Sequence, residues 1–276
     1  MTGAGNDFVL IDNREHTSSS DWASLAPILC NRRFGIGADG LLVVENHSSA
    51  DFKMLYYNAD GSFGGMCGNG GRCAARFMMD SLQKDSVTFE ALDHRYQAGR
   101  RGDLVRLIMK DPSNIQFNQT LTLEKEQISF HFIDTGAPHT VISMINLSAD
   151  AQKEIRSRGI TGIGSAIRNH PRFQPKGTNV DFLEKEREGR IAMRTYERGV
   201  EDETLACGTG AVASAIVSAQ IFGLSSPVEI HTRSGQILLV EFNGEASHPT
   251  GVSLTGQAEV VFQGTYKLNQ FTRSHA

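Results

Sequence analysis

A cysteine followed by Gly-x-Gly occurs twice in the chain, as Cys67-Gly68-Asn69-Gly70 and as Cys207-Gly208-Thr209-Gly210. Each copy leads into a run of small residues with helical spacing, so we expect each thiol at the start of a helix. Unpaired backbone N–H groups and the positive end of the helix dipole favour a thiolate over a thiol there. The repeated motif therefore predicts a pair of sulfur bases.

The glycines beside each cysteine predict a site for an anion. They leave the backbone uncovered, so a carboxylate can approach the N–H groups of Gly68 and Asn69, and those of Gly208 and Thr209. If both helices hold one carboxylate, the adjacent carbon lies between two sulfurs. One sulfur can remove its proton and the other can return a proton, which inverts the centre. Because the helix ends stabilise the developing charge, we expect no cofactor.

Two other interpretations compete for the cysteines. A free cysteine is usually a small buried hydrophobe, and we favour this for Cys30, in an apolar run, and for Cys73, two turns after Cys67. Zinc would need closely spaced ligand pairs, and no histidine accompanies Cys67 and Cys73, so we expect no metal. A non-catalytic thiol switch or zinc-binding protein is the alternative from another functional class.

Charged residues precede the second cysteine. Arg198 could hold a second carboxylate bidentately and Glu197 an ammonium, which would select a substrate with amino-acid groups at both ends. A solvated surface pair is the alternative. His139 is either a site residue or a satisfied loop histidine. These types of side chain predict an amino-acid substrate.

Three amides lie beside turn signals, where an ordinary turn role competes with ligand binding. They are Asn6, Asn58 and Asn179.

The composition narrows the class of protein. The chain has 276 residues, 39% hydrophobic residues and a formal charge of -4, with no long basic block. It shows no apolar run of bilayer length and no basic-then-apolar N-terminal segment. We therefore expect a cytoplasmic protein with free thiols, a small amino-acid substrate, no nucleic acid and no membrane. A homodimer is left open.

Strand and helix patterns recur in both halves of the chain. The patterns predict helices at 25–33, with Pro27 in the first turn, and at 74–82, 149–158, 163–169 and 209–222. They predict strands at 7–12, 40–45, 51–58, 86–92, 94–98, 104–109, 128–133, 139–144, 180–184, 190–196, 228–232, 237–242 and 258–262. Each half therefore consists of strands around one long helix.

Motifs along almost the whole chain resemble those of the diaminopimelate epimerase family. They are GAGNDF at 3–8, FGIGADG at 34–40, NADGS at 58–62, MCGNG at 66–70, GTN at 177–179, ERG at 197–199 and ACGTG at 206–210. The resemblance implies an α+β fold of two pseudo-symmetric domains, each a mixed sheet or barrel wrapped around a central helix. We place the domains at 1–114, with 263–276 returning to it, and at 115–262.

The resemblance also implies interconversion of LL- and meso-2,6-diaminopimelate in lysine biosynthesis, without a cofactor. It implies that Cys67 and Cys207 are the two bases, supported by Glu197 and His139. The remaining residues would bind the substrate: Asn6, Asn58, Gly68, Asn69, Asn179, Glu197, Arg198, Gly208 and Thr209.

Three positions depart from the family pattern. Gly40 stands where many members have a substrate-binding glutamine, Ala137 replaces an asparagine, and the opening strand is short or absent. The alternative is a related racemase of the proline racemase type, which typically has histidine where Asn69 stands. Asn69 and Thr209 favour the epimerase.

Overall fold

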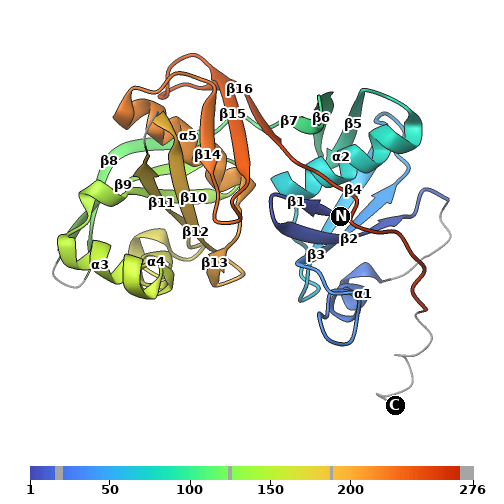
Figure 1. Ribbon diagram of the computed structural model, residues 1–276, viewed down its shortest axis with the longest axis horizontal. Helices are drawn as coiled ribbons and strands as arrows, with labels where there is room; N and C mark the ends of the chain where they lie inside the picture. The colour runs from blue at the N-terminus through green and yellow to red at the C-terminus, as the bar shows by residue number, and fades with distance from the viewer. Residues whose placement is uncertain (16–20, 124–125, 187–188, 268–276) are drawn as a thin grey trace. The chain divides into compact units, whose positions relative to one another are not determined.

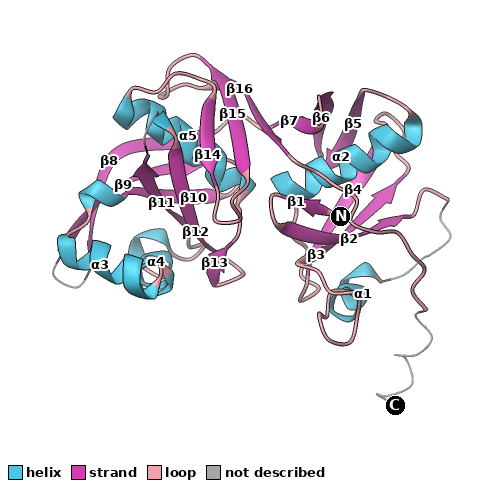
Figure 2. Ribbon diagram, in the orientation of Figure 1, coloured by secondary structure: helices cyan, strands magenta, loops and turns pink. Residues whose placement is uncertain are grey.

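The structure, a computed structural model, describes residues 1–15, 21–123, 126–186 and 189–267. The chain divides into two compact units of mixed sheet and helix (Figures 1 and 2). Unit 1 comprises residues 1–105 and the segment that begins at Gln257, and unit 2 comprises residues 106–256. The predicted α+β class, with one long helix in the mixed sheet of each unit, is confirmed.

The boundaries between the units differ from those expected. The first lies within β7 (Leu104–Ile108), since the backbone N–H of Met109 already donates to the carbonyl of Val252 in unit 2 at 2.8 Å. At the second, Thr2 and Glu259 exchange two backbone hydrogen bonds of 2.9 Å, which ties the segment after Gln257 to unit 1. The expected boundaries after residues 114 and 262 therefore come too late, and residues 268–276 lie outside the described part.

In unit 1 the strands follow the order β1-β2-β3-β4-β5-β6-β7 across the sheet. Their bounds are β1 Thr2–Gly3, β2 Asn6–Asp12, β3 Gly40–Glu45, β4 Phe52–Asn58, β5 Ser86–Ala91 and β6 His94–Arg101, with helices α1 Trp22–Leu29 and α2 Gly68–Leu82. Helix α2 buries its small and thioether side chains, Ala74, Ala75, Met78 and Met79, completely. This burial anchors α2 against the sheet.

In unit 2 the strand order is β16-β15-β14-β12-β11-β10-β9-β8, with β13 beside β12. The strands are β8 Ser113–Leu123, β9 Glu126–Asp134, β10 Pro138–Ser143, β11 Asn179–Lys185, β12 Ile191–Glu197, β13 Asp202–Thr204, β14 Val228–His231, β15 Ile237–Asn243 and β16 Thr250–Gly256. The helices are α3 Ala149–Arg158, α4 Thr161–Arg168 and α5 Gly208–Phe222, with short 3-10 turns η1 Met144–Asn146 and η2 Pro171–Phe173. Helix α5 is apolar on nearly all sides and is the central helix of this unit.

The two units repeat one pattern of strand pairing. Strands β2 and β3 pair in parallel, as do β10 and β11, and the next pairs, β3 with β4 and β11 with β12, are antiparallel. The following strands, β5 and β14, join β4 and β12 in parallel. Helix α2 follows β4 in the chain, and α5 follows β12 with only the short strand β13 between them. The weak sequence repeat therefore corresponds to a structural repeat with its cysteines at matching places.

Several predicted elements are corrected by the structure. Helix α1 ends at Leu29 and holds Pro27 in its interior rather than in its first turn. The predicted strand at 258–262 is wrong, because only Glu259 forms an isolated bridge, to Thr2. Strands β8 and β16 were not predicted. β16 contains glycine and polar residues, and it forms a strand because β15 supplies its backbone partners.

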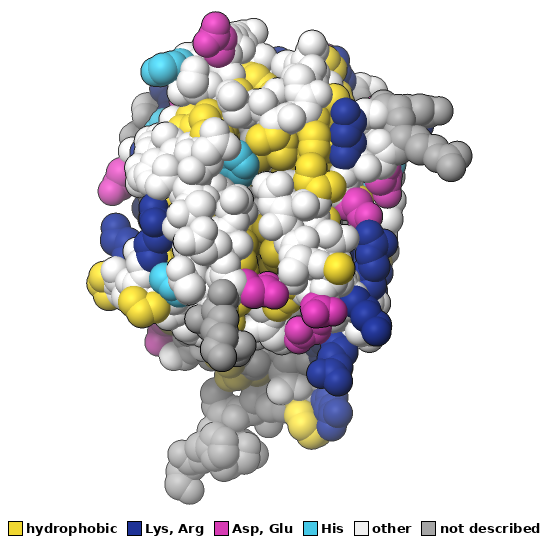
Figure 3. Space-filling model, turned by 90° about the vertical axis from the view of Figure 1, so that its left-hand side faces the viewer, with side chains coloured by type: hydrophobic (Ala, Val, Ile, Leu, Met, Phe, Trp, Pro, Cys, Tyr) yellow, Lys and Arg dark blue, Asp and Glu magenta, His cyan; other side chains and the backbone are white. Residues whose placement is uncertain are grey.

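Charges of both signs lie on the face of the molecule that Figure 3 shows. On the face shown in Figure 3, lysine and arginine side chains are interspersed with acidic ones. Opposite charges also pair at the surface of unit 2, as Arg156 does with Glu184 at 2.7 Å. None of the helices in the described residues is long and apolar enough to cross a bilayer.

Candidate active site

Each cysteine of the repeated motif is the N-cap residue of the long helix in its unit. Cys67 precedes α2, and its Sγ accepts a hydrogen bond from the Gly70 N–H at 3.5 Å. Cys207 precedes α5, and its Sγ accepts from the Gly210 N–H at 3.4 Å. Each sulfur thus receives one of the donors that a helix leaves unpaired in its first turn. The prediction that both thiols lie at helix N-termini is confirmed.

The second glycine of each motif leaves room for a side chain from the sheet. A Cβ on Gly70 would lie 3.0 Å from Leu42 Cδ2, whereas a Cβ on Gly210 would lie 2.6 Å from Asp181 Oδ1. Leu42 in β3 and Asp181 in β11 thus occupy equivalent positions of the repeat. The same place in the fold holds a hydrocarbon in one unit and a carboxylate in the other.

In unit 1 the Asn6 side chain lies beside Cys67. Its Oδ1 accepts from Cys67 Sγ at 3.7 Å and from Asn69 Nδ2 at 3.4 Å. Its Nδ2 donates to Asp39 at 2.6 Å, and Asp39 pairs with Arg32 at 2.6 Å. Arg32 therefore belongs to a chain of contacts that fixes the Asn6 amide next to the sulfur.

Arg72 was not singled out from the sequence, although it lies one turn into α2. Its guanidinium is fully buried and donates to Gly68 O at 3.2 Å and to Asn69 Oδ1 at 2.8 Å. Burial lowers the pKa of Arg72, and negative charge on Cys73 or Cys67 opposes this effect. The hydrogen bond from Arg72 to Asn69 Oδ1 holds this side chain in the orientation in which its Nδ2 donates to Asn6 Oδ1.

Asn58 does not join this group of contacts. Its amide donates to Ser62 Oγ at 2.9 Å and accepts from the Tyr56 hydroxyl at 2.8 Å, as expected for a residue at the start of a turn. At Gly40 no side chain would fit, because a Cβ would lie 2.6 Å from Tyr56 Cε2 and 2.7 Å from Tyr57 O. The packing around residue 40 therefore suits the glycine that this chain has where the family pattern has glutamine.

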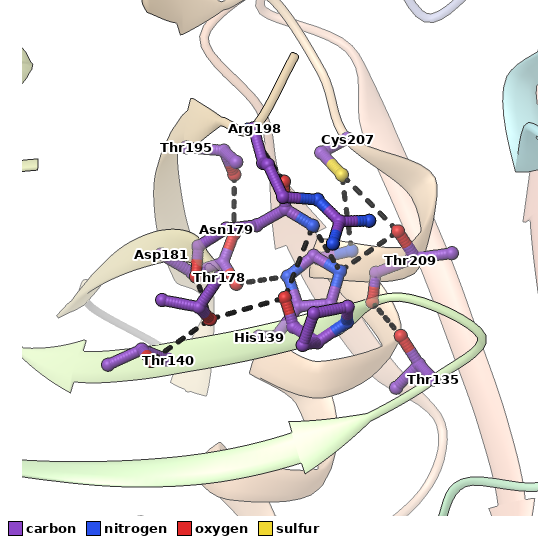
Figure 4. Close-up of polar contacts among 12 residues, drawn as sticks. Thr135, His139, Thr140, Thr178, Asn179, Asp181, Thr195, Arg198, Cys207 and Thr209 are labelled. Atoms are coloured by element: carbon purple, nitrogen blue, oxygen red, sulfur yellow. Dashed lines mark hydrogen bonds and ion pairs between the residues drawn. The ribbon is translucent and has the colours of Figure 1, made fainter. Parts of the chain in front are cut away.

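In unit 2, hydrogen bonds connect Cys207 to a buried carboxylate (Figure 4). Cys207 Sγ lies 3.4 Å from Thr209 Oγ1, and Thr209 Oγ1 lies 2.9 Å from His139 Nε2. His139 Nδ1 lies 2.7 Å from Asp181 Oδ2, and both side chains have 0% exposure. His139 is in strand β10, so the interpretation as a loop histidine is wrong.

Asp181 accepts hydrogen bonds on both oxygens. Thr195 Oγ1 donates to its Oδ1 at 2.6 Å, and the His139 ring occupies its Oδ2. A carboxylate that accepts from Nδ1–H leaves the lone pair of Nε2 directed at Thr209. Asp181 was missed from the sequence, although a charge within the apolar run Val180 to Leu183 was the available signal.

The other predicted residues of unit 2 surround this chain of hydrogen bonds. Asn179 Nδ2 lies 3.4 Å from His139 Nε2, and its Oδ1 accepts from the Arg198 backbone N–H at 2.8 Å. The Arg198 guanidinium donates to Lys176 O at 3.1 Å. Glu197 is the last residue of β12, and its negative charge acts on Cys207.

The thiols have different electrostatic environments. Burial raises the pKa of Cys207 well above its ordinary 9.0, and the charges of Glu197 and Asp181 raise it further. Hydrogen bonds from Thr209 and Gly210 act in the opposite direction but do not outweigh these effects. At Cys207, burial and the neighbouring carboxylates therefore outweigh the preference for the thiolate that the helix N-terminus supplies.

The remaining cysteines are buried, as predicted. Burial raises the pKa of Cys30 to about 11 and that of Cys73 to about 12. Among the described residues, no three histidine, cysteine or acidic side chains are grouped so that they could hold a metal ion. In unit 1 a cavity of about 400 Å³ lies between β2 and residues 260–264, and no predicted site residue lines it.

The comparisons with known proteins decide the family. The family model described as diaminopimelate epimerase matches residues 1–101 and 131–261. A diaminopimelate epimerase of Aquifex aeolicus is 40% identical, over 96% of this chain and 95% of its own. That of Chlorobaculum tepidum is 41% identical, over 97% of this chain and 100% of its own. The chain belongs to the diaminopimelate epimerase family.

Solved structures of other families share the fold of this diaminopimelate epimerase family member. A probable proline racemase from Agrobacterium radiobacter has a TM-score of 0.71 at 15% identity, covering 99% of this chain and 93% of its own. A phenazine biosynthesis protein from Bacillus anthracis has a TM-score of 0.64 at 10% identity, covering 93% and 92%. At these identities the likeness shows the fold alone.

Proposed function

We propose that this chain epimerises diaminopimelate, interconverting the LL and meso forms in lysine biosynthesis. The observation that carries the proposal is the repeated thiol: each unit has a cysteine at the N-cap of its long helix, hydrogen-bonded to the glycine N–H three residues on. Family membership, at about 40% identity over nearly the whole chain, supports the same substrate.

The proposed reaction uses the two sulfurs as a base and an acid. In the LL to meso direction, the Cys67 thiolate takes the α-proton and the Cys207 thiol delivers a proton to the opposite face of the carbon. The reverse reaction exchanges these roles. The raised pKa of Cys207 supports its role as the proton donor in the forward direction, because it retains its proton at neutral pH. The scheme needs no cofactor.

The helix termini supply the electrostatic part of catalysis in this proposal. The N–H groups of Gly68 and Asn69, and those of Gly208 and Thr209, would hold the carboxylate and stabilise the charge that develops on it.

The side chains around the two cysteines would recognise the rest of the substrate. Asn6, Asn58 and Asn179 would bind its amino and carboxylate groups, and Arg198 its distal carboxylate. Glu197 and His139 would act on the reacting centre. Asn6 and Asn179 are supported by their contacts to Cys67 Sγ at 3.7 Å and to His139 Nε2 at 3.4 Å.

Incubation in deuterated water tests the substrate and the chemistry together. With LL-diaminopimelate we expect meso product that carries deuterium at the inverted carbon, and with L-proline we expect no exchange. Deuteration of proline alone would overturn the assignment and favour the racemase alternative.

The cysteine variants test the two-thiol scheme. Cys67→Ala and Cys207→Ala should each lower kcat by at least about 10²-fold, the typical contribution of one acid or base. Cys30→Ala is the matched control, since this thiol is buried away from the motif, and it should retain activity. Wild-type rates in either of the first two variants would refute the scheme.

A cytoplasmic location and a homodimer stay predictions. Sedimentation of the purified protein tests whether it forms a homodimer.

A further inference from the structure

The buried guanidinium of Arg72 has no acidic partner among the described residues. It has 0% exposure and is the largest of the fully buried side chains there. Its Nε makes no hydrogen bond, and the only negative charges that act on it are those that Cys73 and Cys67 carry as thiolates. Burial raises the pKa of Cys73 to about 12, so Cys73 is a neutral thiol at pH 7. A buried charge without a partner is costly and is rarely found in a fold.

The repeat shows that the fold does not require a cation at this place. Arg72 lies five positions after Cys67, and the residue five positions after Cys207 is Val212 in α5, which also has 0% exposure. Unit 2 thus has a hydrocarbon at the equivalent place of its central helix. The burial of a guanidinium in unit 1 is therefore better explained by a negative charge that the site must hold than by packing.

The hydrogen bonds of Arg72 lead to the first two residues of α2. Its Nη1 donates to the carbonyl of Gly68 at 3.2 Å, and its Nη2 donates to Asn69 Oδ1 at 2.8 Å. The Gly68 carbonyl and the Asn69 N–H belong to the same peptide group. A cationic donor on the carbonyl polarises this group and makes its N–H a stronger donor. The N–H groups at the start of a helix favour an anion, and this cation strengthens that preference.

We propose that Arg72 supplies the positive charge of a carboxylate site at the start of α2. The guanidinium acts through the Gly68–Asn69 peptide, so Arg72 is a positioning residue that attracts the carboxylate without contacting it. The proposal rests on the proposed function for the identity of the ligand, the reacting carboxylate of the substrate. In unit 2 the cysteine that precedes α5 instead faces the negative charges of Glu197 and Asp181. We therefore expect the start of α2 to attract a carboxylate more strongly than the start of α5.

Two alkylating reagents measure this attraction without the substrate. Iodoacetate carries a carboxylate next to its reactive carbon, and iodoacetamide is its neutral analogue. Both react with the thiolate, so the ratio of the two products that a mixture forms at one cysteine does not depend on its thiolate fraction. Peptide mass spectrometry gives the ratio of carboxymethylated to carbamidomethylated product at Cys67 and at Cys207 in the same sample.

The wild-type protein gives the first result. We expect the product ratio at Cys67 to exceed that at Cys207, because only Cys67 has a buried cation behind its helix terminus. An equal or lower ratio at Cys67 would overturn the proposal. This comparison does not depend on the folding of any variant.

Replacement of the guanidinium gives the second result. Arg72→Met removes the charge and keeps an unbranched side chain, and it should lower the product ratio at Cys67 by at least about threefold while the ratio at Cys207 stays the same. If Arg72 acts on the thiolate alone, the variant changes the rates of both reagents equally. An unchanged ratio at Cys67 would therefore refute the carboxylate site.

Asn69→Ala is the matched control for a purely structural role of Arg72. It removes the side chain that Arg72 holds and keeps the hydrogen bond from the guanidinium to Gly68. We expect the ratio at Cys67 in this variant to stay closer to the wild-type ratio than to that of Arg72→Met. A fall as large as that in Arg72→Met would contradict the role of the charge. Failure of the wild type to epimerise LL-diaminopimelate, with these product ratios intact, would refute only the substrate assignment.

Discussion

Replacement of Gly210 by alanine should destabilise unit 2. The new Cβ would lie 2.6 Å from Asp181 Oδ1 and 3.3 Å from Asp181 Cγ, contacts that require movement. Asp181 cannot turn away without loss of its hydrogen bonds to His139 at 2.7 Å and Thr195 at 2.6 Å. Overpacking of this kind costs about 1–3 kcal/mol, while alanine recovers at most about 1 kcal/mol of helix propensity. Part of the energy of one disturbed buried hydrogen bond adds to this cost, so we expect the free energy of unfolding to fall by about 2 kcal/mol.

The matched control for this substitution lies in the other unit. A Cβ on Gly70 would meet Leu42 Cδ2 at 3.0 Å, and the end of this side chain makes no hydrogen bonds and needs only a small shift, so Gly70→Ala should change stability by less than about 1 kcal/mol. For domains of this size, about 2 kcal/mol corresponds to a shift of about 4–8 °C in Tm. Thermal unfolding followed by circular dichroism measures both variants. If Gly210→Ala melts at or above the temperature of Gly70→Ala, the close packing against Asp181 is refuted.

Two further predictions concern unit 1. Burial raises the pKa of Asp51, but the Lys84 ammonium at 2.5 Å and donors of the neighbouring strand outweigh burial, so the pKa lies below its ordinary 3.8. The stabilisation is therefore present above the ordinary pKa of 3.8 and is lost as the pH falls through the lower folded pKa. Asp51→Asn should therefore lower Tm at pH 7 and lower it less as the pH falls below 3.8. Equal Tm values at pH 7 would contradict this. Iodoacetamide at pH 7 should modify Cys67 before Cys30 and Cys73, because Cys67 is partly exposed and the pKa values of the two buried thiols are raised to about 11 and about 12. Peptide mass spectrometry measures the rate of modification at each cysteine. Equal rates at the three cysteines would contradict this difference in exposure and pKa.

Local chemistry explains what could be predicted from the sequence. The Cys-Gly-x-Gly motif specifies its own structure, because the N-cap side chain, the small residues and the first helical turn are adjacent in the chain. The long apolar strands were predicted for the same reason, and 40–45 coincides with β3. β16 was missed because Gly251, Ser253 and Gly256 weaken its strand pattern, and pairing with β15 determines its conformation.

The sequence by itself therefore determined the two thiols, their helix termini and the family, because each of these depends on short motifs whose own residues are adjacent in the chain. Only the tertiary structure decided what surrounds each thiol. The pairing of β10 with β11 brings His139 and Asp181 together across 42 positions of sequence, and the repeat places leucine at the matching position of unit 1. Strand register determines which side chains meet behind a helix, and a sequence motif does not contain that information. The two units thus share one backbone pattern while giving their cysteines different electrostatic surroundings.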